Sequence, residues 1–250
     1  MSRPIPSRAE SLLLPAFVGL DMAQIVVPAT ADQFALAAGQ IMAAGVAGFD
    51  TESKPTFRVG ETSDGPHTVQ FAIQRADGGA DGGAAGRGDS RADSRADGYC
   101  GYVFQVLRPE SLAPLAALLG SARLLKAGFG LGSDRSQIQA RLGLVAQGVL
   151  DLNTVFSQQG YRRDLGVRAA VAVVFGQRFL KSKKVTTTNW ALPHLTPNQV
   201  RYAANDAYAA LRVWQALQQA ARVDRADPVD HLDHVDHVDH VDHVDRPHPP

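Results

Sequence analysis

The sequence predicts an α/β fold in which a mixed β-sheet is flanked by α-helices. Two observations carry this prediction. Short apolar runs that are typical of buried strands alternate with helical segments along residues 24–220. Two of the strand segments, 67–76 and 99–107, follow one another without an intervening helix and therefore predict a hairpin.

The elements before the hairpin begin with a strand or strand entry at 24–29. Thr30 and Gln33 have the spacing of a capping box, which predicts a helix from this point to about residue 44. The apolar run that follows, 44–53, ends in polar residues, as expected of a buried strand that carries a site at its end. The first hairpin strand alternates between apolar and polar side chains with a period of two.

The connection within the hairpin, residues 77–98, consists almost entirely of Ala, Gly, Asp, Arg and Ser, with near-repeats. Such a segment lacks the apolar surface that would offset the entropy lost on ordering it, so we predict a flexible insert. Beyond the hairpin, Thr196 is the predicted N-cap of the longest helix. The predicted elements are a helix at 110–119, a strand at 123–130, helices at 132–143, 164–176 and 195–220, and a strand-to-helix transition at 149–156.

The predicted domain spans residues 24–222, after an N-terminal extension at 1–23. A tail at 223–250 repeats Val-Asp-His with a period of three, which fits neither a helix nor a strand. We expect a disordered charged tail, with weak binding of divalent metal as the alternative. Cys100 is the sole cysteine, which excludes an internal disulfide and a cysteine-based zinc site.

Charge is distributed unevenly along the chain, although 25 basic and 25 acidic residues give a formal net charge of zero. Residues 120–223 contain fourteen Lys and Arg but only four Asp and Glu, so this part is a candidate surface for a polyanion. Solvated helix faces would explain the same excess equally well. No window approaches the roughly 18 apolar residues of a membrane span. We therefore expect a cytoplasmic protein with neither a signal peptide nor a membrane contact.

Two acidic side chains, Asp50 and Glu52, end the predicted buried strand at 44–53. Residues at i and i+2 of a strand project from the same face. Two adjacent carboxylates near a core repel each other unless a cation bridges them or one binds a proton, and oxygen-rich clusters suit Mg²⁺ or Mn²⁺. Taken alone, the pair also fits a strand end that turns into solvent.

Two further acids strengthen the prediction of a metal site. Asp134 lies near a predicted helix start, where an ordinary first-turn acid is also common. Tyr202 and Asp206 are four residues apart on a helix and share a face, and the alanines around Asp206 predict close packing. A buried acid needs a partner or a metal. Four converging acids could hold two divalent cations about 4 Å apart, with the Tyr202 hydroxyl orienting an attacking water.

These residues lie in motifs that resemble those of a known family. The motifs are GFDTE at 48–52, KAGFGLGSD at 126–134, GQRFLKSKKVTTTNW at 176–190 and YAANDAYAALRVW at 202–214. In their order and separation the chain resembles the DEDDy 3′–5′ exonucleases of the ribonuclease H-like superfamily, and within them the Werner-syndrome-type exonuclease domain. The likeness covers about residues 24–220. The insert and the tail have no counterpart in the family pattern.

The resemblance implies a ribonuclease H-like sheet and hydrolysis of phosphodiester bonds at a 3′ end, with release of nucleoside monophosphates. It implies that Asp50, Glu52 and Asp206 bind the more tightly held of two metals, Mg²⁺ or Mn²⁺, with Asp50 bridging to the second. Asp134 would hold the second metal, directly or through water. Tyr202 would orient the nucleophilic water.

Contacts with the substrate are implied less completely. The backbone near Thr51 would meet the 3′-terminal nucleotide. Trp190 is a candidate for stacking on a base, although a packing role is favoured. Lys181 and its neighbours lie in a matching segment without an assigned role.

The implied substrate is nucleic acid, with DNA favoured. Two alternatives remain open: an exoribonuclease of the ribonuclease D kind that acts on RNA, and a catalytically silent nucleic-acid-binding module.

Overall fold

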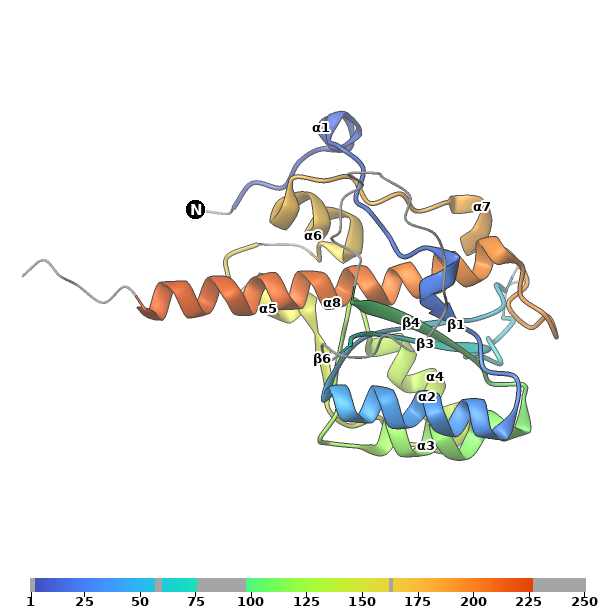
Figure 1. Cartoon of the computed structure of the whole chain (residues 1–250). Coiled ribbons are helices and arrows are strands. Elements are labelled where there is room, and N and C mark those ends of the chain that lie inside the picture. Colours follow the sequence, from blue (N-terminus) through green and yellow to red (C-terminus); the bar gives the residue numbers. More distant parts are fainter. Residues whose placement is uncertain (1–2, 57–59, 76–97, 162–163, 227–250) are drawn as a thin grey trace, which may run out of the picture.

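The computed structural model describes residues 3–56, 60–75, 98–161 and 164–226. Its centre is a six-stranded sheet with the order β1-β4-β3-β2-β5-β6. The predicted α/β fold with a mixed sheet flanked by helices is confirmed (Figure 1). The strands are β1 (Ile25–Val26), β2 (Val46–Glu52), β3 (Thr68–Gln74), β4 (Tyr99–Gln105), β5 (Leu125–Gly128) and β6 (Val149–Asp151).

The strand pairing explains where the predicted site lies. β3 pairs antiparallel with both β2 and β4, so 67–76 and 99–107 form the expected hairpin. β2 pairs in parallel with β5, and β5 with β6. The strand that carries Asp50 and Glu52 is therefore central, and parallel strands of this kind are covered on both faces.

Helices cover both faces of the sheet. Figure 1 shows α8 and α6 on one side and α2 and α3 on the other. A separate buried apolar cluster lies on each side. The helices are α1 (Arg8–Leu13), α2 (Ala31–Ala44), α3 (Leu112–Gly120), α4 (Gly132–Leu142), α5 (Leu152–Gln158), α6 (Gly166–Phe175), α7 (Lys183–Thr186) and α8 (Pro197–Ala226).

The helix starts predicted from capping residues are present. At α2, the Thr30 hydroxyl accepts a hydrogen bond from Gln33 N, while the Gln33 side chain reaches back to Ala29 N rather than to Thr30. At α8, Thr196 and Gln199 form the reciprocal pair, because Gln199 N donates to Thr196 Oγ1 and Thr196 N donates to Gln199 Oε1. These contacts pair N–H groups that a helix start leaves without partners.

Helix α8 lies unusually close to the sheet. A Cβ atom built on Gly48 of β2 would stand 1.9 Å from the carbonyl oxygen of Ala207, so only glycine fits there. The facing side chains of α8 are small, and Ala203, Ala204 and Ala207 are fully buried. Small residues on both elements thus bring the helix that carries Asp206 against the strand that carries Asp50.

The segment before β1 packs onto the same helix. Phe17 and Leu20 are buried, Leu20 N donates to Asn205 Oδ1 at 2.6 Å, and Ala16 forms a parallel β-bridge with Arg178. The domain boundary at residue 24 stays a prediction, but these residues belong to the core beneath α8. Helices α1 and α7 were not predicted.

Several expectations concern residues that the structure does not describe. Nearly all of the insert at 77–98 and residues 227–250 of the tail lie outside the described residues. Helix α8 continues to Ala226, six residues beyond its predicted end at 220. Among the described parts of the chain, no helix is long and apolar enough to cross a membrane.

Candidate active site

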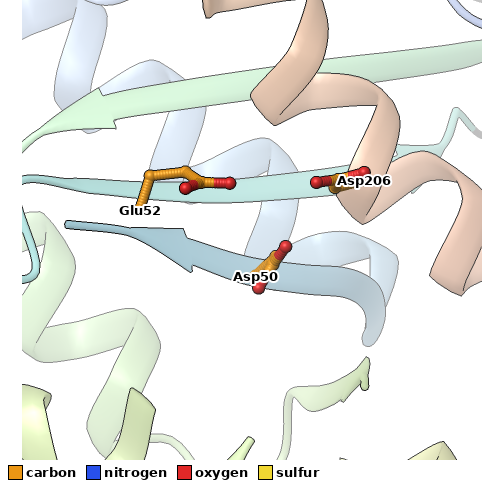
Figure 2. A group of neighbouring side chains, drawn as sticks. All are labelled: Asp50, Glu52 and Asp206. Atoms are coloured by element: carbon orange, nitrogen blue, oxygen red, sulfur yellow. The ribbon is translucent and has the colours of Figure 1, made fainter. Parts of the chain in front are cut away.

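Three carboxylates come together between the end of β2 and the N-terminal half of α8. Asp50, Glu52 and Asp206, here called the acid cluster, each offer one oxygen atom, and these atoms lie within 4.8 Å of one another. Figure 2 shows Asp50 and Glu52 on the strand and Asp206 reaching down from the helix above it. Asp50 and Glu52 share one face of the strand, as the strand periodicity predicted, and Asp206 joins them from a helix far along the chain.

The local structure explains this geometry. Strand alternation puts Asp50 and Glu52 on the face that α8 covers, while Phe49, the residue before Asp50, faces the opposite apolar cluster. The close approach of α8 at Gly48 then places Asp206, one residue before Ala207, beside them. Asp206 is 3% exposed. A carboxylate buried to this extent requires a positive partner.

Burial and mutual repulsion weaken the acidity of the cluster. Burial, followed by the charges of Asp206 and Glu52, raises the pKa of Asp50 well above its ordinary value. Burial and the charge of Asp206 raise the pKa of Glu52 to about 8. Burial also raises the pKa of Asp206, although Lys181 partly offsets this. The cluster therefore favours any added cation, which would relieve both effects.

A lysine contacts the cluster directly. Nζ of Lys181 lies 2.6 Å from Oδ2 of Asp206 and 5.0 Å from the centre of the Tyr202 ring. Burial lowers the pKa of Lys181, but the charges of Asp206 and Asp50 outweigh it, and the net pKa is above its ordinary range. The ammonium group is therefore charged.

Tyr202 lies one helical turn before Asp206. Its hydroxyl group is 2.8 Å from Oγ1 of Thr186 in α7, and its ring is 5.9 Å from that of Trp190. Burial and the charge of Asp206 raise the pKa of Tyr202 to about 12, so the hydroxyl keeps its proton at neutral pH. Trp190 is 1% exposed. Its suggested stacking on a base is thus corrected, because a buried indole has no free face, and the packing role fits.

Asp134 lies beside the cluster rather than in it. It stands in the first turn of α4, and Oδ1 accepts a hydrogen bond from the hydroxyl group of Thr51. Burial raises the pKa of Asp134, and the bond from Thr51 partly offsets the rise. Its negative charge in turn is one of the smaller causes that raise the pKa values of Asp50 and Glu52. This placement suits a ligand that reaches a metal from the side.

The acid cluster fits a divalent metal. Its donors are all carboxylate oxygens, which suit Mg²⁺ and Mn²⁺. Oδ1 of Asp206 is buried and has no hydrogen-bond partner among the described residues. Such an atom needs a cation or a donor that the protein itself does not supply.

A family model described as 3′–5′ exonuclease matches residues 91–222, which is just over half of the chain. The chain belongs to this family of 3′–5′ exonucleases. An Arabidopsis thaliana 3′–5′ exonuclease is 25% identical over 174 residues, covering 68% of this chain and 52% of that protein. The mouse bifunctional 3′–5′ exonuclease/ATP-dependent helicase WRN is 30% identical over 104 residues, covering 41% of this chain and 7% of that protein. The chain thus spans about half the length of the first relative and far less of the second.

Solved structures of other proteins share the fold. The Aedes aegypti Nibbler EXO domain superposes with a TM-score of 0.60 at 19% identity, covering 82% of this chain and 93% of that one. Escherichia coli RNase D, described as an exoribonuclease involved in structured RNA processing, superposes with a TM-score of 0.59 at 18% identity, covering 80% of this chain and 45% of that one. At these identities the likeness shows the ribonuclease H-like fold alone.

The positions of two residues were missed by reasoning from the sequence. Lys181 was noted without a role, and Thr186 was not noted at all. The only signal for Lys181 was its place in the matching segment 176–190, because linear sequence does not show that this segment folds over α8. Conversely, Lys126 of the second motif is buried and donates to the carbonyl oxygens of Leu118, Ser121 and Leu124. It therefore does not belong to a basic surface.

Proposed function

We propose that this chain is a metal-dependent 3′–5′ exonuclease that hydrolyses the terminal phosphodiester bond of DNA and releases nucleoside monophosphates. The observation that carries the proposal is the convergence of the acid cluster with Tyr202 one helical turn away. One buried and two partly buried carboxylates at one place are costly to a protein that uses them only for packing.

In this proposal Asp50, Glu52 and Asp206 would hold one divalent cation, Mg²⁺ or Mn²⁺, and Asp50 and Asp134 would hold a second. Two bound cations would supply a nucleophilic water and stabilise the leaving oxygen. The Tyr202 hydroxyl group, which keeps its proton at neutral pH, would orient the attacking water through a hydrogen bond. Thr51 holds Asp134 in place from the strand side.

Positive charge around the cluster supports a polyanionic substrate. A cavity of about 530 Å³ extends from Asp206 and Tyr202 to Arg201 and the segment at 17–21. A neighbouring cavity of about 320 Å³ is lined by Arg168 and Lys181. Phosphates bind such positions by displacing counter-ions, so binding should weaken with salt.

RNA is the second candidate substrate, since an RNA complex of a Trypanosoma brucei RNase D has a TM-score of 0.59 to this chain. The 2′-hydroxyl group is the chemical difference that a site can use to distinguish the two. A third possibility is a silent binding module, which would bind nucleic acid without cleaving it.

The test compares 5′-labelled DNA and RNA of the same sequence in Mg²⁺, in Mn²⁺ and in chelator. We expect a ladder that shortens from the 3′ end, requires metal and runs faster on DNA. The Asp50→Asn variant should give no ladder but should still bind the oligonucleotide. A faster RNA ladder would reverse the substrate preference, and binding without any ladder would establish the silent module.

A further inference from the structure

The contact between Lys181 and Asp206 has consequences for metal binding at the acid cluster. An ammonium group 2.6 Å from a carboxylate that is 3% exposed is a direct ion pair. Lys181 lies in the segment between the β-bridge at Arg178 and helix α7, and its side chain reaches Asp206 from there. It is the one ion-pair partner of Asp206 among the described residues.

The same ammonium cannot remain unaffected when a divalent cation binds. A metal bound to Asp206 at the usual oxygen distance of about 2.1 Å and an ammonium on the same carboxylate would lie only a few ångströms apart. Like charges at that separation repel strongly in a buried site, where solvent screening is weak. The lysine and the metal therefore compete for one carboxylate.

The structure provides space for the lysine side chain to leave. The Lys181 side chain is 24% exposed and has a flexible four-carbon stem. It lines both the cavity of about 320 Å³ beside Arg168 and Thr186, and a second cavity of about 450 Å³ below α1. The backbone can stay in place meanwhile, since the carbonyl oxygen of Lys181 accepts a hydrogen bond from Arg168.

We propose that Lys181 is a built-in counter-cation of the metal site, which neutralises Asp206 until a divalent metal displaces it. The proposal rests on the proposed function, because it takes the acid cluster to be the metal site, and it adds a form of regulation to it. The lysine keeps the carboxylates together and lowers the apparent affinity for metal. The apparent affinity equals the intrinsic affinity multiplied by the fraction of molecules in which Asp206 is free to bind metal.

The first test measures Mn²⁺ binding by electron paramagnetic resonance, without nucleic acid, in the full chain and in two lysine variants. Lys181→Met keeps a side chain of similar length but removes the charge, and we expect it to bind Mn²⁺ about tenfold more tightly. Lys184→Met, three residues along the same segment and exposed, is the matched control and should bind like the unaltered chain. Equal or weaker binding by Lys181→Met would overturn the proposal.

A second measurement distinguishes displacement from a simple loss of nearby charge. The unaltered chain is treated with an amine-acetylating reagent, with and without saturating Mg²⁺, and the modification of each lysine is measured by peptide mass spectrometry. Displacement predicts that Mg²⁺ increases acetylation of Lys181 and leaves that of Lys184 unchanged. If acetylation of Lys181 stays constant while Mg²⁺ binds, the lysine is not displaced.

The two proposals fail in different ways. The Asp50→Asn variant should lose Mn²⁺ binding in either lysine background if the acid cluster is the metal site. Absence of Mn²⁺ binding in the unaltered chain and in Lys181→Met alike would reject the metal site, and the role of Lys181 with it. Normal binding that is insensitive to Lys181 would reject only the role of the lysine.

Discussion

The hydroxyl group of Thr51 donates a hydrogen bond to Oδ1 of Asp134, which joins the end of β2 to the first turn of α4. The same residue donates its backbone N–H to Oδ1 of Asp50 at 2.9 Å. One residue thus orients two acids that belong to different elements. The hydroxyl group of Thr51 therefore links the position of Asp134 to the strand that carries the acid cluster.

Replacing Thr51 with valine should lower kcat/KM for 3′-end cleavage about tenfold. Valine has nearly the same shape but lacks the donor, and a hydrogen bond to a charged group contributes about 1.5–3 kcal/mol. Thr51→Ser keeps the hydroxyl group and should stay close to the unaltered rate. Steady-state kinetics on a labelled oligonucleotide measures both. A full rate in Thr51→Val would mean that Asp134 is oriented by other contacts.

Removing the hydroxyl group of Tyr202 should lower kcat about a hundredfold. Phenylalanine keeps the ring packing against Trp190 and the ring contact with Lys181, so the fold and the Mn²⁺ affinity should be retained. Single-turnover kinetics and Mn²⁺ titration separate these effects. Thr186→Val is the control, since it removes only the other partner of the hydroxyl group and should cost far less. Weakened Mn²⁺ binding in Tyr202→Phe would point instead to a structural role.

The raised pKa of Glu52 predicts how stability depends on pH in the presence of chelator. Its pKa is about 8 in the folded protein against an ordinary value of 4.5, so the folded state binds more protons between these values. The contribution of Glu52 to the free energy of unfolding is therefore most favourable below about pH 4.5. It becomes less favourable as the pH rises towards 8. Binding of a divalent metal should counteract the loss, because it stabilises the ionised carboxylates.

Replacing Glu52 with glutamine removes this titration. In chelator at pH 8 the variant should melt at least about 2 °C higher than the unaltered chain, although it should lack activity. At pH 5 the difference should shrink, and added Mg²⁺ should stabilise only the unaltered chain. Thermal melts across this pH range, with chelator or with Mg²⁺, measure the gain at pH 8, its decrease at pH 5 and the effect of Mg²⁺. Glu110→Gln, at an exposed position, should change none of them, and an equal gain there would remove Glu52 as the cause.

Local patterns in the sequence were enough to predict most of the site. Strand periodicity placed Asp50 and Glu52 on one face, and helix spacing placed Tyr202 beside Asp206. Both patterns depend only on residues that are close in sequence, and the strand or helix itself fixes which of their side chains share a face. The resemblance to a known family then supplied the association between these distant segments, and the structure agrees with it for three of the four acids.

What the sequence did not predict depends on contacts between distant segments. Lys181 reaches Asp206 only because its segment folds over α8, and Leu20 reaches Asn205 across 185 positions. Neither contact leaves a periodic pattern. Trp190 was uncertain for another reason, because an aromatic residue in a polar segment has the same sequence signature whether it packs or stacks. Its burial follows from where α7 and α8 meet.

The close approach of α8 to β2 predicts that Gly48→Ala will destabilise the protein by about 3 kcal/mol or more. The added Cβ would stand 1.9 Å from the carbonyl oxygen of Ala207 and 2.9 Å from Cβ of Leu211, and backbone cannot move aside cheaply. Because any relief moves α8 away from β2, it also moves Asp206 away from Asp50. Mn²⁺ affinity should therefore fall together with stability.

Gly39→Ala is the matched control for this substitution. Gly39 lies within α2, is exposed, and its added Cβ would meet no atom within 4 Å. Alanine is favoured over glycine inside helices, so this variant should gain about 0.5–1 kcal/mol and keep its Mn²⁺ affinity. Urea unfolding in chelator and Mn²⁺ titration measure both properties. If Gly48→Ala lost stability but bound Mn²⁺ normally, the spacing of α8 and β2 would not control the distance between the two carboxylates.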